Sequence, residues 1–197
     1  ILRPDTSLEK LATLKPAFDK RSGMGTLTAG NSTNLSDGAS VALLSSEQWA
    51  HDNNREIHAY LVDAQVAAVD FVAGEGLLMA PAWAVAQLLK RNNLSLQDFD
   101  FYEIHEAFAA QVLCTLKAWE SEEFCTTKLG MDGALGAIDR SKLNVVGSSL
   151  ALGHPFAATG ARIVATAAKL LKEKGQGRVL ISICTAGGMG VAAIVER

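Results

Sequence analysis

Gly147-Ser-Ser-Leu-Ala-Leu-Gly-His-Pro-Phe-Ala-Ala-Thr-Gly-Ala-Arg162 is the stretch around which the rest of the chain is organised. Its glycines and Pro155 predict a loop that carries His154, and the residues that follow predict a helix running to about Glu173. A histidine on such a loop can accept or donate a proton near neutral pH, because its unperturbed pKa is about 6.5. We expect two other short segments to lie beside His154: residues 105–109, His-Glu-Ala-Phe-Ala, and residues 184–190, Cys-Thr-Ala-Gly-Gly-Met-Gly.

Helical and extended patterns alternate along the 197 residues, which indicates an α/β fold of one sizeable core. Helices are predicted over residues 7–14, from Ser46, over 79–91 (stopped by Asn92 and Asn93), over 106–119 and up to Glu173. Strands are predicted at 57–71 (one or two buried strands), 100–104, 178–184 and 189–196, the last two as a hairpin. Residues 120–142 are expected to form a surface excursion of uncertain structure.

Charge and cysteine content restrict the class of function. The net charge is −3, and such weak acidity argues against nucleic acid as a main partner. The one basic cluster, Lys169, Lys172 and Lys174, ends a predicted helix, where cations usually complement the helix C-terminus. Three cysteines form no Cys-x-x-Cys pair, which is typical of reduced thiols in the cytoplasm or an organelle matrix such as the mitochondrial matrix. No apolar run reaches the length of a membrane span, and no secretory leader is visible.

The loop over residues 23–38 is rich in Gly, Ser, Thr and Asn. Small side chains and free N–H groups suit the close approach of a ligand, and they equally suit a plain connection between elements.

Cys184 ends a predicted strand and is followed at once by Thr-Ala-Gly-Gly, so its thiol is expected at the rim of the sheet beside the N–H groups of a turn. A thiol and an imidazole together can perform acyl transfer with a proton shuttle. Taken singly, each has a better structural explanation, because an isolated strand cysteine is usually an inert buried residue and an isolated Gly-His-Pro segment is usually a turn. Zinc is a third interpretation, and the absence of short paired ligand spacings argues against it.

Five motifs in order make the sequence resemble the C-terminal half of the thiolase family, from about Arg3 to the end. They are residues 25–31 (Gly-Thr-Leu-Thr-Ala-Gly-Asn), 37–39 (Asp-Gly-Ala), 105–109, 153–160 (Gly-His-Pro-Phe-Ala-Ala-Thr-Gly) and 184–190. The resemblance implies an α/β thiolase-like fold in which a mixed β-sheet is covered by helices. It also implies that residues 1–36 end a linker region and that residues 37–197 form the C-terminal thiolase domain.

The resemblance further implies a role for individual residues. His154 is expected to accept the proton of the nucleophilic cysteine and to help hold the thioester oxygen. Cys184 is expected to be the acid/base for the α-proton, and the backbone N–H of Ala186, where the family often has Gly, to line a second oxyanion hole. Thr33, with its neighbour Ser32, is expected to lie near the pantetheine arm of coenzyme A.

His105 departs from the family pattern, because many thiolases have Asn there to position a water in the first oxyanion hole. A histidine can also hold a water, and together with the 120–142 excursion it favours fatty-acid degradation over short-chain acetoacetyl-CoA chemistry. Glu106 has two readings: it orients His105, or it caps the following helix.

The expected reaction is the cleavage of 3-ketoacyl-CoA by CoA into acetyl-CoA and a shortened acyl-CoA, with CoA as substrate and no tightly bound cofactor. Thiolases attack with a cysteine of their N-terminal half, and Cys114 and Cys125 lack the setting that lowers a thiol pKa. Expected partners are therefore acyl-CoA, an N-terminal thiolase half and a second copy of the chain, since the isolated half would expose an apolar face. A hydratase/dehydrogenase subunit is a further candidate.

Three alternatives stay open from the sequence. A short-chain acetoacetyl-CoA thiolase differs only in substrate. A ketoacyl synthase has a second histidine where Cys184 stands, which argues against that family. A non-catalytic CoA-binding or assembly module would not need both His154 and Cys184.

Overall fold

The computed structural model describes residues 3–197 and contains one four-stranded mixed sheet. The strand order is β1-β4-β3-β2, where β2 and β3 are parallel and the other neighbours antiparallel. The strands are β1 (Tyr60–Ala68), β2 (Phe101–Ile104), β3 (Arg178–Thr185) and β4 (Met189–Glu196). The predicted α/β class with a mixed sheet is confirmed, as are the short strand before His105 and the C-terminal hairpin.

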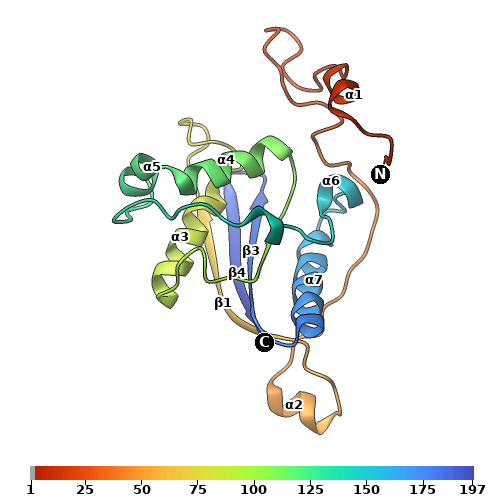
Figure 1. Cartoon of the computed structure of the whole chain (residues 1–197), viewed down its shortest axis with the longest axis vertical. Coiled ribbons are helices and arrows are strands. Elements are labelled where there is room, and N and C mark those ends of the chain that lie inside the picture. Colours follow the sequence, from red (N-terminus) through yellow and green to blue (C-terminus); the bar gives the residue numbers. More distant parts are fainter. Residues whose placement is uncertain (1–2) are drawn as a thin grey trace.

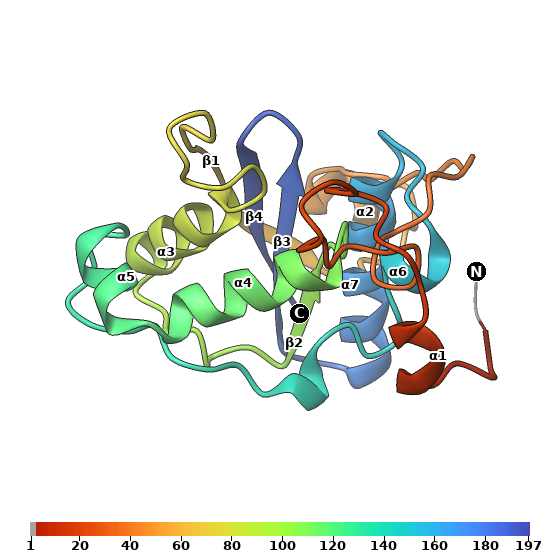
Figure 2. The ribbon, with the colours of Figure 1, turned by 90° about the horizontal axis from the view of Figure 1, so that it is seen from above.

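Helices cover both faces of this sheet (Figures 1 and 2). Helices α3 (Ala80–Asn92) and α4 (Ala109–Glu120) pack on one face, and α7 (Thr159–Lys174) packs on the other. Successive side chains of a strand point to opposite faces, so Leu180 of β3 joins the α3/α4 core while Val179 and Ile181 join the α7 core. This double burial explains why β3 and β4 read as continuous apolar runs.

Helix α3 lies very close to β4 at Gly190. A Cβ atom on Gly190 would lie 2.5 Å from the backbone nitrogen of Pro81, so only glycine fits there. At its other end α3 stops at Asn93, which adopts the left-handed conformation with φ 52° and confirms the predicted stop.

Strand β1 differs from the prediction of one or two buried strands over residues 57–71. It is a single strand at the edge of the sheet, and Leu61, Val62 and Val66 are about half exposed or more. Its side toward α3 carries the polar residues Asp63 and Gln65 as well as Ala67, and Asp63 accepts from the guanidinium of Arg91 at 2.8 Å. The apolar composition of this segment therefore predicts correctly that it forms a strand, but it does not predict that the strand is exposed.

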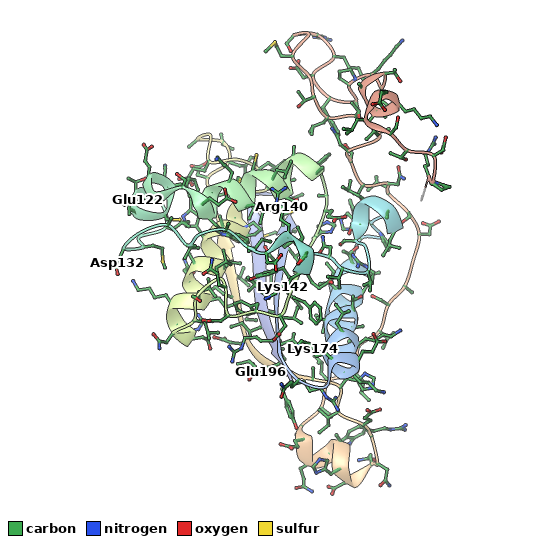
Figure 3. All side chains as sticks on the ribbon, viewed as in Figure 1. Glu122, Asp132, Arg140, Lys142, Lys174 and Glu196 are labelled. Carbon is green, nitrogen blue, oxygen red and sulfur yellow. The ribbon has the colours of Figure 1, made fainter. Side chains whose placement is uncertain are left out.

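The remaining elements are short. They are α1 (Leu8–Ala12), α2 (Glu47–Asp52), α5 (Glu122–Thr127), the 3-10 turn η1 (Arg140–Lys142) and α6 (Ser149–Leu152). The predicted excursion over 120–142 is better ordered than expected, because it contains α5 and η1 and buries Cys125 and Ile138. Figure 3 shows its labelled charged residues Glu122, Asp132 and Arg140 around α5 and along the connection toward η1. In Figure 1, α1 and α2 lie at opposite ends of the molecule, joined by a segment that runs beside α7.

Each lysine of the predicted basic cluster faces a carboxylate. Lys174 Nζ lies 3.0 Å from Asp100 Oδ1, Lys172 Nζ lies 2.6 Å from Glu56 Oε2, and Lys169 pairs with Glu173 at 3.7 Å. The cluster therefore presents no concentrated positive surface. None of the helices within residues 3–197 has the length and apolar character needed to cross a membrane.

Candidate active site

The two segments that follow β2 and β3 meet at one edge of the sheet. Because β2 and β3 are parallel, their C-terminal ends lie side by side, and the His105 N–H donates to the Ser182 carbonyl at 2.9 Å. Cys184 lies two residues further along β3, and the backbone N–H of Ala107 is close enough to its thiol to lower the thiol pKa, against the larger effect of burial. Residues from the His-Glu-Ala-Phe-Ala and Cys-Thr-Ala-Gly-Gly motifs are thus brought together.

Residues 106–108 are not the start of a helix, which corrects the prediction for 106–119. They are paired with the Gly/Ser/Thr/Asn-rich loop: Thr33 N–H donates to the Ala107 carbonyl, and Ala109 N–H donates to the Asn31 carbonyl, both at 2.9 Å. Ser32 and Phe108 form an antiparallel bridge. This pairing delays the start of α4 to Ala109 and gives the loop a structural role beside the site.

The same loop also holds the histidine segment. His154 N–H donates to the Asn34 carbonyl at 2.8 Å, and Leu35 forms a parallel bridge with His154. As a result the His154 and His105 rings lie with centroids 4.3 Å apart, tilted by 51°. Phe156 packs on the His154 ring at 4.6 Å, so one imidazole is flanked by two rings.

The protonated nitrogen of His154 follows from the partners of Thr159. The Thr159 hydroxyl bonds the Pro155 carbonyl at 3.2 Å, and its oxygen lies 2.6 Å from His154 Nδ1. Thr159 makes both contacts when it donates its single hydroxyl proton to the carbonyl and accepts from Nδ1–H of His154. This tautomer leaves Nε2 with a free lone pair. Burial and the charge of Arg162 lower the pKa of His154, which favours the neutral ring.

His105 is almost completely buried, and its Nδ1 lies 2.8 Å from Ser149 Oγ. Burial, with smaller contributions from His154 and Arg162, lowers the pKa of His105 to about 4. The ring is therefore neutral at physiological pH.

Cys184 is buried, and this burial raises the pKa of its thiol to about 12, against the opposing effect of its own N–H and that of Ala107. The thiol is therefore protonated at neutral pH. Across residues 3–197 no hydrogen bond joins the Cys184 sulfur to either imidazole, so the sulfur is a separate proton carrier and not part of a thiolate–imidazolium pair.

Glu106 neither orients His105 nor caps α4, so both readings from the sequence are wrong. Its carboxylate accepts from Asn144 Nδ2 at 2.6 Å and from the backbone N–H of Leu150 at 3.1 Å. Asn144 also bonds both the N–H and the carbonyl of Ile104 at 2.9 Å. Glu106 and Asn144 therefore tie the end of β2 to the histidine segment.

Ala186, Ser32 and Thr33 lie around the same edge. Ala186 is exposed in the turn between β3 and β4, where Gly187 and Gly188 have positive φ. The Thr33 hydroxyl donates to the Ser149 carbonyl at 2.6 Å, and Ser32 Oγ is buried without a hydrogen-bond partner within residues 3–197.

Several polar residues around the histidines did not emerge from the sequence: Glu103, Ser149, Thr159 and Arg162. Glu103 did carry a signal, because an acid inside the apolar strand Phe-Tyr-Glu-Ile is unusual in a buried position. The others lie inside the histidine motif itself, and only the tertiary contacts reveal their partners.

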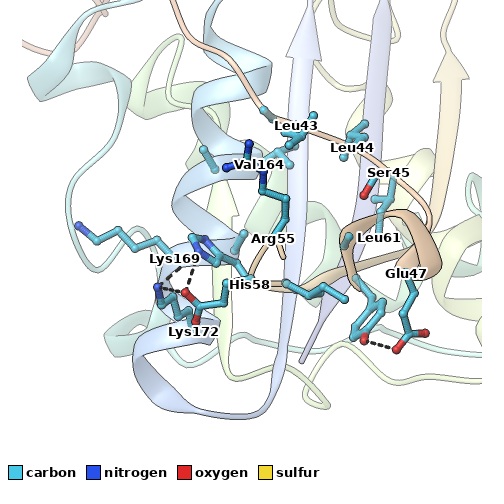
Figure 4. Close-up of a pocket in the computed structure, with 18 of the residues that line it drawn as sticks. Leu43, Leu44, Ser45, Glu47, Arg55, His58, Leu61, Val164, Lys169 and Lys172 are labelled. Carbon is cyan, nitrogen blue, oxygen red and sulfur yellow. Dashed lines mark hydrogen bonds and ion pairs between the residues drawn. The ribbon is translucent and has the colours of Figure 1, made fainter. Parts of the chain in front are cut away.

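A groove lies away from His105 and His154, between α7 and the segment around α2 (Figure 4). It has a volume of about 920 Å³ and is lined by apolar residues such as Leu43, Leu44 and Val164, with Lys172 and His58 at one end. None of the sequence-predicted site residues lines it.

Comparison with known families accounts for this arrangement. The model of the thiolase C-terminal domain matches residues 55–197, and the model of the thiolase N-terminal domain matches residues 1–48. The chain belongs to the thiolase family. The fold resemblance drawn from the five motifs is thereby confirmed.

Individual thiolases agree. A 3-ketoacyl-CoA thiolase of Shewanella loihica is 45% identical over 195 residues, which is 99% of this chain and 44% of that protein. The crystal structure of the Bacillus anthracis acetyl-CoA acetyltransferase superposes with a TM-score of 0.80 at 40% identity, over 98% of this chain and 43% of that one. Human mitochondrial 3-ketoacyl-CoA thiolase in complex with CoA gives a TM-score of 0.78 at 33% identity, with the same coverage. This thiolase chain thus spans less than half the length of these relatives.

Proposed function

We propose that residues 37–197 are the C-terminal catalytic domain of an acetyl-CoA C-acyltransferase that cleaves 3-ketoacyl-CoA with CoA in fatty-acid degradation. The observation that carries the proposal is the convergence of His105, His154 and Cys184 from three separate segments on one edge of the sheet. Membership of the thiolase family and the name of the Shewanella relative support it.

In the first half-reaction His154 Nε2 takes the proton of an attacking cysteine thiol, whose sulfur adds to the 3-keto carbon. The bond between C2 and C3 then breaks. The electron pair left on C2 takes the proton of the Cys184 thiol, which releases acetyl-CoA and leaves an acyl-cysteine. A lone pair on His154 Nε2 and a protonated Cys184 are the starting states that this step requires.

In the second half-reaction the Cys184 thiolate takes the proton of an incoming CoA thiol. The CoA sulfur attacks the acyl-cysteine, and the cysteine leaves as a thiolate that recovers its proton from His154. Protons therefore balance over the cycle, and no bound cofactor takes part. His105 supplies a polar contact for the oxyanion of the attacked carbonyl, and the Ala186 N–H supplies one for the thioester enolate.

The attacking cysteine is proposed to come from thiolase sequence outside these 197 residues. Cys125 is fully buried and its S–H faces the carbonyls of Ala118 and Trp119, and Cys114 is exposed on α4. Within the described residues neither thiol forms a hydrogen bond with an imidazole. The remainder of an N-terminal domain is accordingly the first partner we propose.

The surface available to that partner is apolar. Val41, Leu43 and Leu44 are mostly exposed beside the groove of Figure 4, in a segment that the N-terminal domain model matches. The edge strand β1 leaves Val62 and Val66 exposed as well, which supports assembly into a homo-oligomer. A hydratase/dehydrogenase subunit is a further proposed partner.

Ser32 and Thr33 are proposed to line the CoA channel, because their loop is paired with both the Ala107 and the His154 segments. The human neighbour was solved with CoA, which supports CoA as the substrate. The bacterial relative supports a cytoplasmic location.

The deciding experiment is thiolysis of 3-ketoacyl-CoA by the chain alone and after co-expression with an N-terminal domain from a relative. We expect no turnover alone, turnover with the added domain, and loss of that turnover on Cys184→Ala. Turnover that survives Cys184→Ala would overturn the proposed role of Cys184 as the acid/base. Binding of CoA with no turnover in any combination would instead support a non-catalytic module.

A second candidate, a short-chain acetoacetyl-CoA thiolase, is favoured by the acetyl-CoA acetyltransferase neighbour. Comparing kcat/KM for acetoacetyl-CoA and a long-chain 3-ketoacyl-CoA separates the two. A preference for the longer substrate supports the degradative enzyme.

A further inference from the structure

Behind His105 lies a buried polar chain that the proposed mechanism does not use. Arg162 Nη2 donates to Ser149 Oγ at 3.1 Å, and Ser149 Oγ lies 2.8 Å from His105 Nδ1. Ser149 is fully buried and His105 nearly so. The carboxyl of Glu103 is also fully buried, and the charge of Arg162 acts on it, but among residues 3–197 it forms no ion pair within 4 Å.

The direction of the hydrogen bond between Ser149 and His105 follows from counting donors. A serine hydroxyl has one proton and two lone pairs, and Arg162 occupies one of the lone pairs because a guanidinium can only donate. If His105 Nδ1–H donated to the other lone pair, the Ser149 proton would be buried without an acceptor among residues 3–197. An unsatisfied buried donor costs about 1–3 kcal/mol. The favoured arrangement is therefore a hydroxyl that donates to Nδ1.

We propose that Arg162 and Ser149 are positioning residues that fix His105 as the Nε2–H tautomer and so present a hydrogen-bond donor to the reacting carbonyl oxygen. The two adjacent histidines then have opposite tautomers. His154 offers a lone pair at Nε2, whereas His105 offers a proton at Nε2. The inference rests on the proposed function for the identity of the oxygen, and on the hydrogen bonds alone for the tautomer.

The charges around His105 agree with this assignment. Arg162 and His154 are its charged or titratable neighbours, and a cation nearby disfavours imidazolium. Burial lowers the pKa of Arg162, and Glu103 from β2 and Glu106 from the following loop oppose this shift. A guanidinium nevertheless keeps its protons at physiological pH. Arg162 thus remains a donor to Ser149, and the hydrogen bonds from Arg162 through Ser149 to His105 keep the same direction.

The test is a long-range ¹H–¹⁵N spectrum of the ¹⁵N-histidine-labelled chain at pH 7.5, in which the two ring nitrogens give distinct signals. His105→Asn identifies the His105 signals among the four histidines. We expect protonated Nε2 and unprotonated Nδ1 for His105, and the reverse for His154. Ser149→Ala is expected to change the His105 tautomer population, whereas Ser149→Thr, which keeps a hydroxyl, is expected to preserve it.

A protonated His105 Nδ1 in the parent chain would overturn the inference, and that measurement needs no variant to fold. With the N-terminal domain added, Ser149→Ala and Arg162→Met are expected to lower kcat by up to about 10²-fold, the contribution of one oxyanion donor, with a smaller change in KM. Expected tautomers without turnover by the reconstituted parent would overturn the proposed function alone. Turnover with the opposite tautomer would overturn this inference alone.

Discussion

His105 and His154 lie ring against ring, 4.3 Å between centroids, yet each Nδ1 is bonded to a different hydroxyl, that of Ser149 for His105 and that of Thr159 for His154. Among residues 3–197 no carbonyl accepts a hydrogen bond from the Ser149 hydroxyl, whereas the Thr159 hydroxyl bonds the Pro155 carbonyl. The two neighbouring imidazoles are therefore expected to carry their proton on different ring nitrogens, and in each case one hydroxyl group decides which nitrogen it is.

Removing the Thr159 hydroxyl should weaken the base. In Thr159→Val, Nδ1–H of His154 loses its acceptor, so the ring can adopt the tautomer that lacks a lone pair at Nε2. We expect kcat of the reconstituted enzyme to fall by about 10-fold, a part of the roughly 10²–10⁴-fold that general base catalysis contributes, because His154 itself remains. Thr159→Ser keeps the hydroxyl and is the matched control. Equal kcat for the valine and serine variants would contradict the role of this hydroxyl.

The three cysteines should differ sharply in reactivity. At pH 8 a thiol with a pKa of about 12 is a thiolate in only about one molecule in 10⁴, and both Cys184 and Cys125 are buried. We therefore expect iodoacetamide to label Cys114 first, as read by peptide mass spectrometry. The denatured chain, in which all three should react, is the control. Preferential labelling of Cys184 in the folded chain would be inconsistent with a protonated, buried thiol.

Glu103 and His105 should give opposite pH dependences of stability. Burial raises the pKa of Glu103 to about 7, with Arg162 opposing and Glu106 adding to the shift. The folded state keeps this proton while the unfolded chain loses it near pH 4.5. Glu103 therefore contributes about 3 kcal/mol to the free energy of unfolding. This contribution is complete below pH 4.5 and is lost as the pH rises to 7. For His105 the lowered pKa gives a contribution complete above pH 6.5 and lost as the pH falls toward 4.

Urea unfolding from pH 4 to 8 separates the two groups. Relative to the parent chain, Glu103→Gln should gain about 3 kcal/mol as the pH rises from 4.5 to 7, and His105→Asn should gain a similar amount as the pH falls from 6.5 to 4. The parent should show a shallow profile where the windows overlap. Difference curves that stay flat with pH would refute the assignment.

Asn144 should be costly to replace. Its side chain makes three hydrogen bonds at the end of β2, and its backbone has φ 47°. Asn144→Ala loses these bonds. It also places alanine, whose side chain cannot form the local hydrogen bonds of asparagine, in the left-handed region of the backbone. We therefore expect a loss of about 2–4 kcal/mol in the free energy of unfolding. Asn144→Gly loses only the bonds and should lie between. An alanine variant as stable as the parent would exclude a structural role for Asn144.

Local pattern was sufficient for much of the fold. The hairpin of β3 and β4, the stop of α3 at Asn93 and the loop that carries His154 all depend on residues close in sequence, where glycine, asparagine and apolar runs act directly. The order of the motifs also indicated the thiolase family, and with it a site that contains His105, His154 and Cys184. The structure brings the three segments to one edge of the sheet.

The errors arose where a distant segment decides the outcome. The first turn predicted at Glu106 is absent because residues 31–33 pair with 107–109, a contact that no helical propensity encodes. The apolar strand β1 is exposed because it lies at the edge of the sheet, and position within a sheet is not a property of its own residues. Ser149 and Arg162 were missed for the same reason, since Ser149 contacts the distant His105 and Arg162 acts on that histidine through Ser149.

The parallel pairing of β2 with β3 has a kinetic consequence. The β3–β4 hairpin closes over a short turn, whereas β2 reaches β3 only after everything between them, including α4 and α7, has been brought into place. Contacts across so long a loop form late in folding, because the chain entropy of closing the loop is lost before they stabilise it. The edge that holds both imidazoles is therefore expected to be completed after the folding transition state. Substitutions at this edge should accelerate unfolding more than they slow folding. Changes in the site that holds the two imidazoles are therefore expected to shorten the lifetime of the folded state.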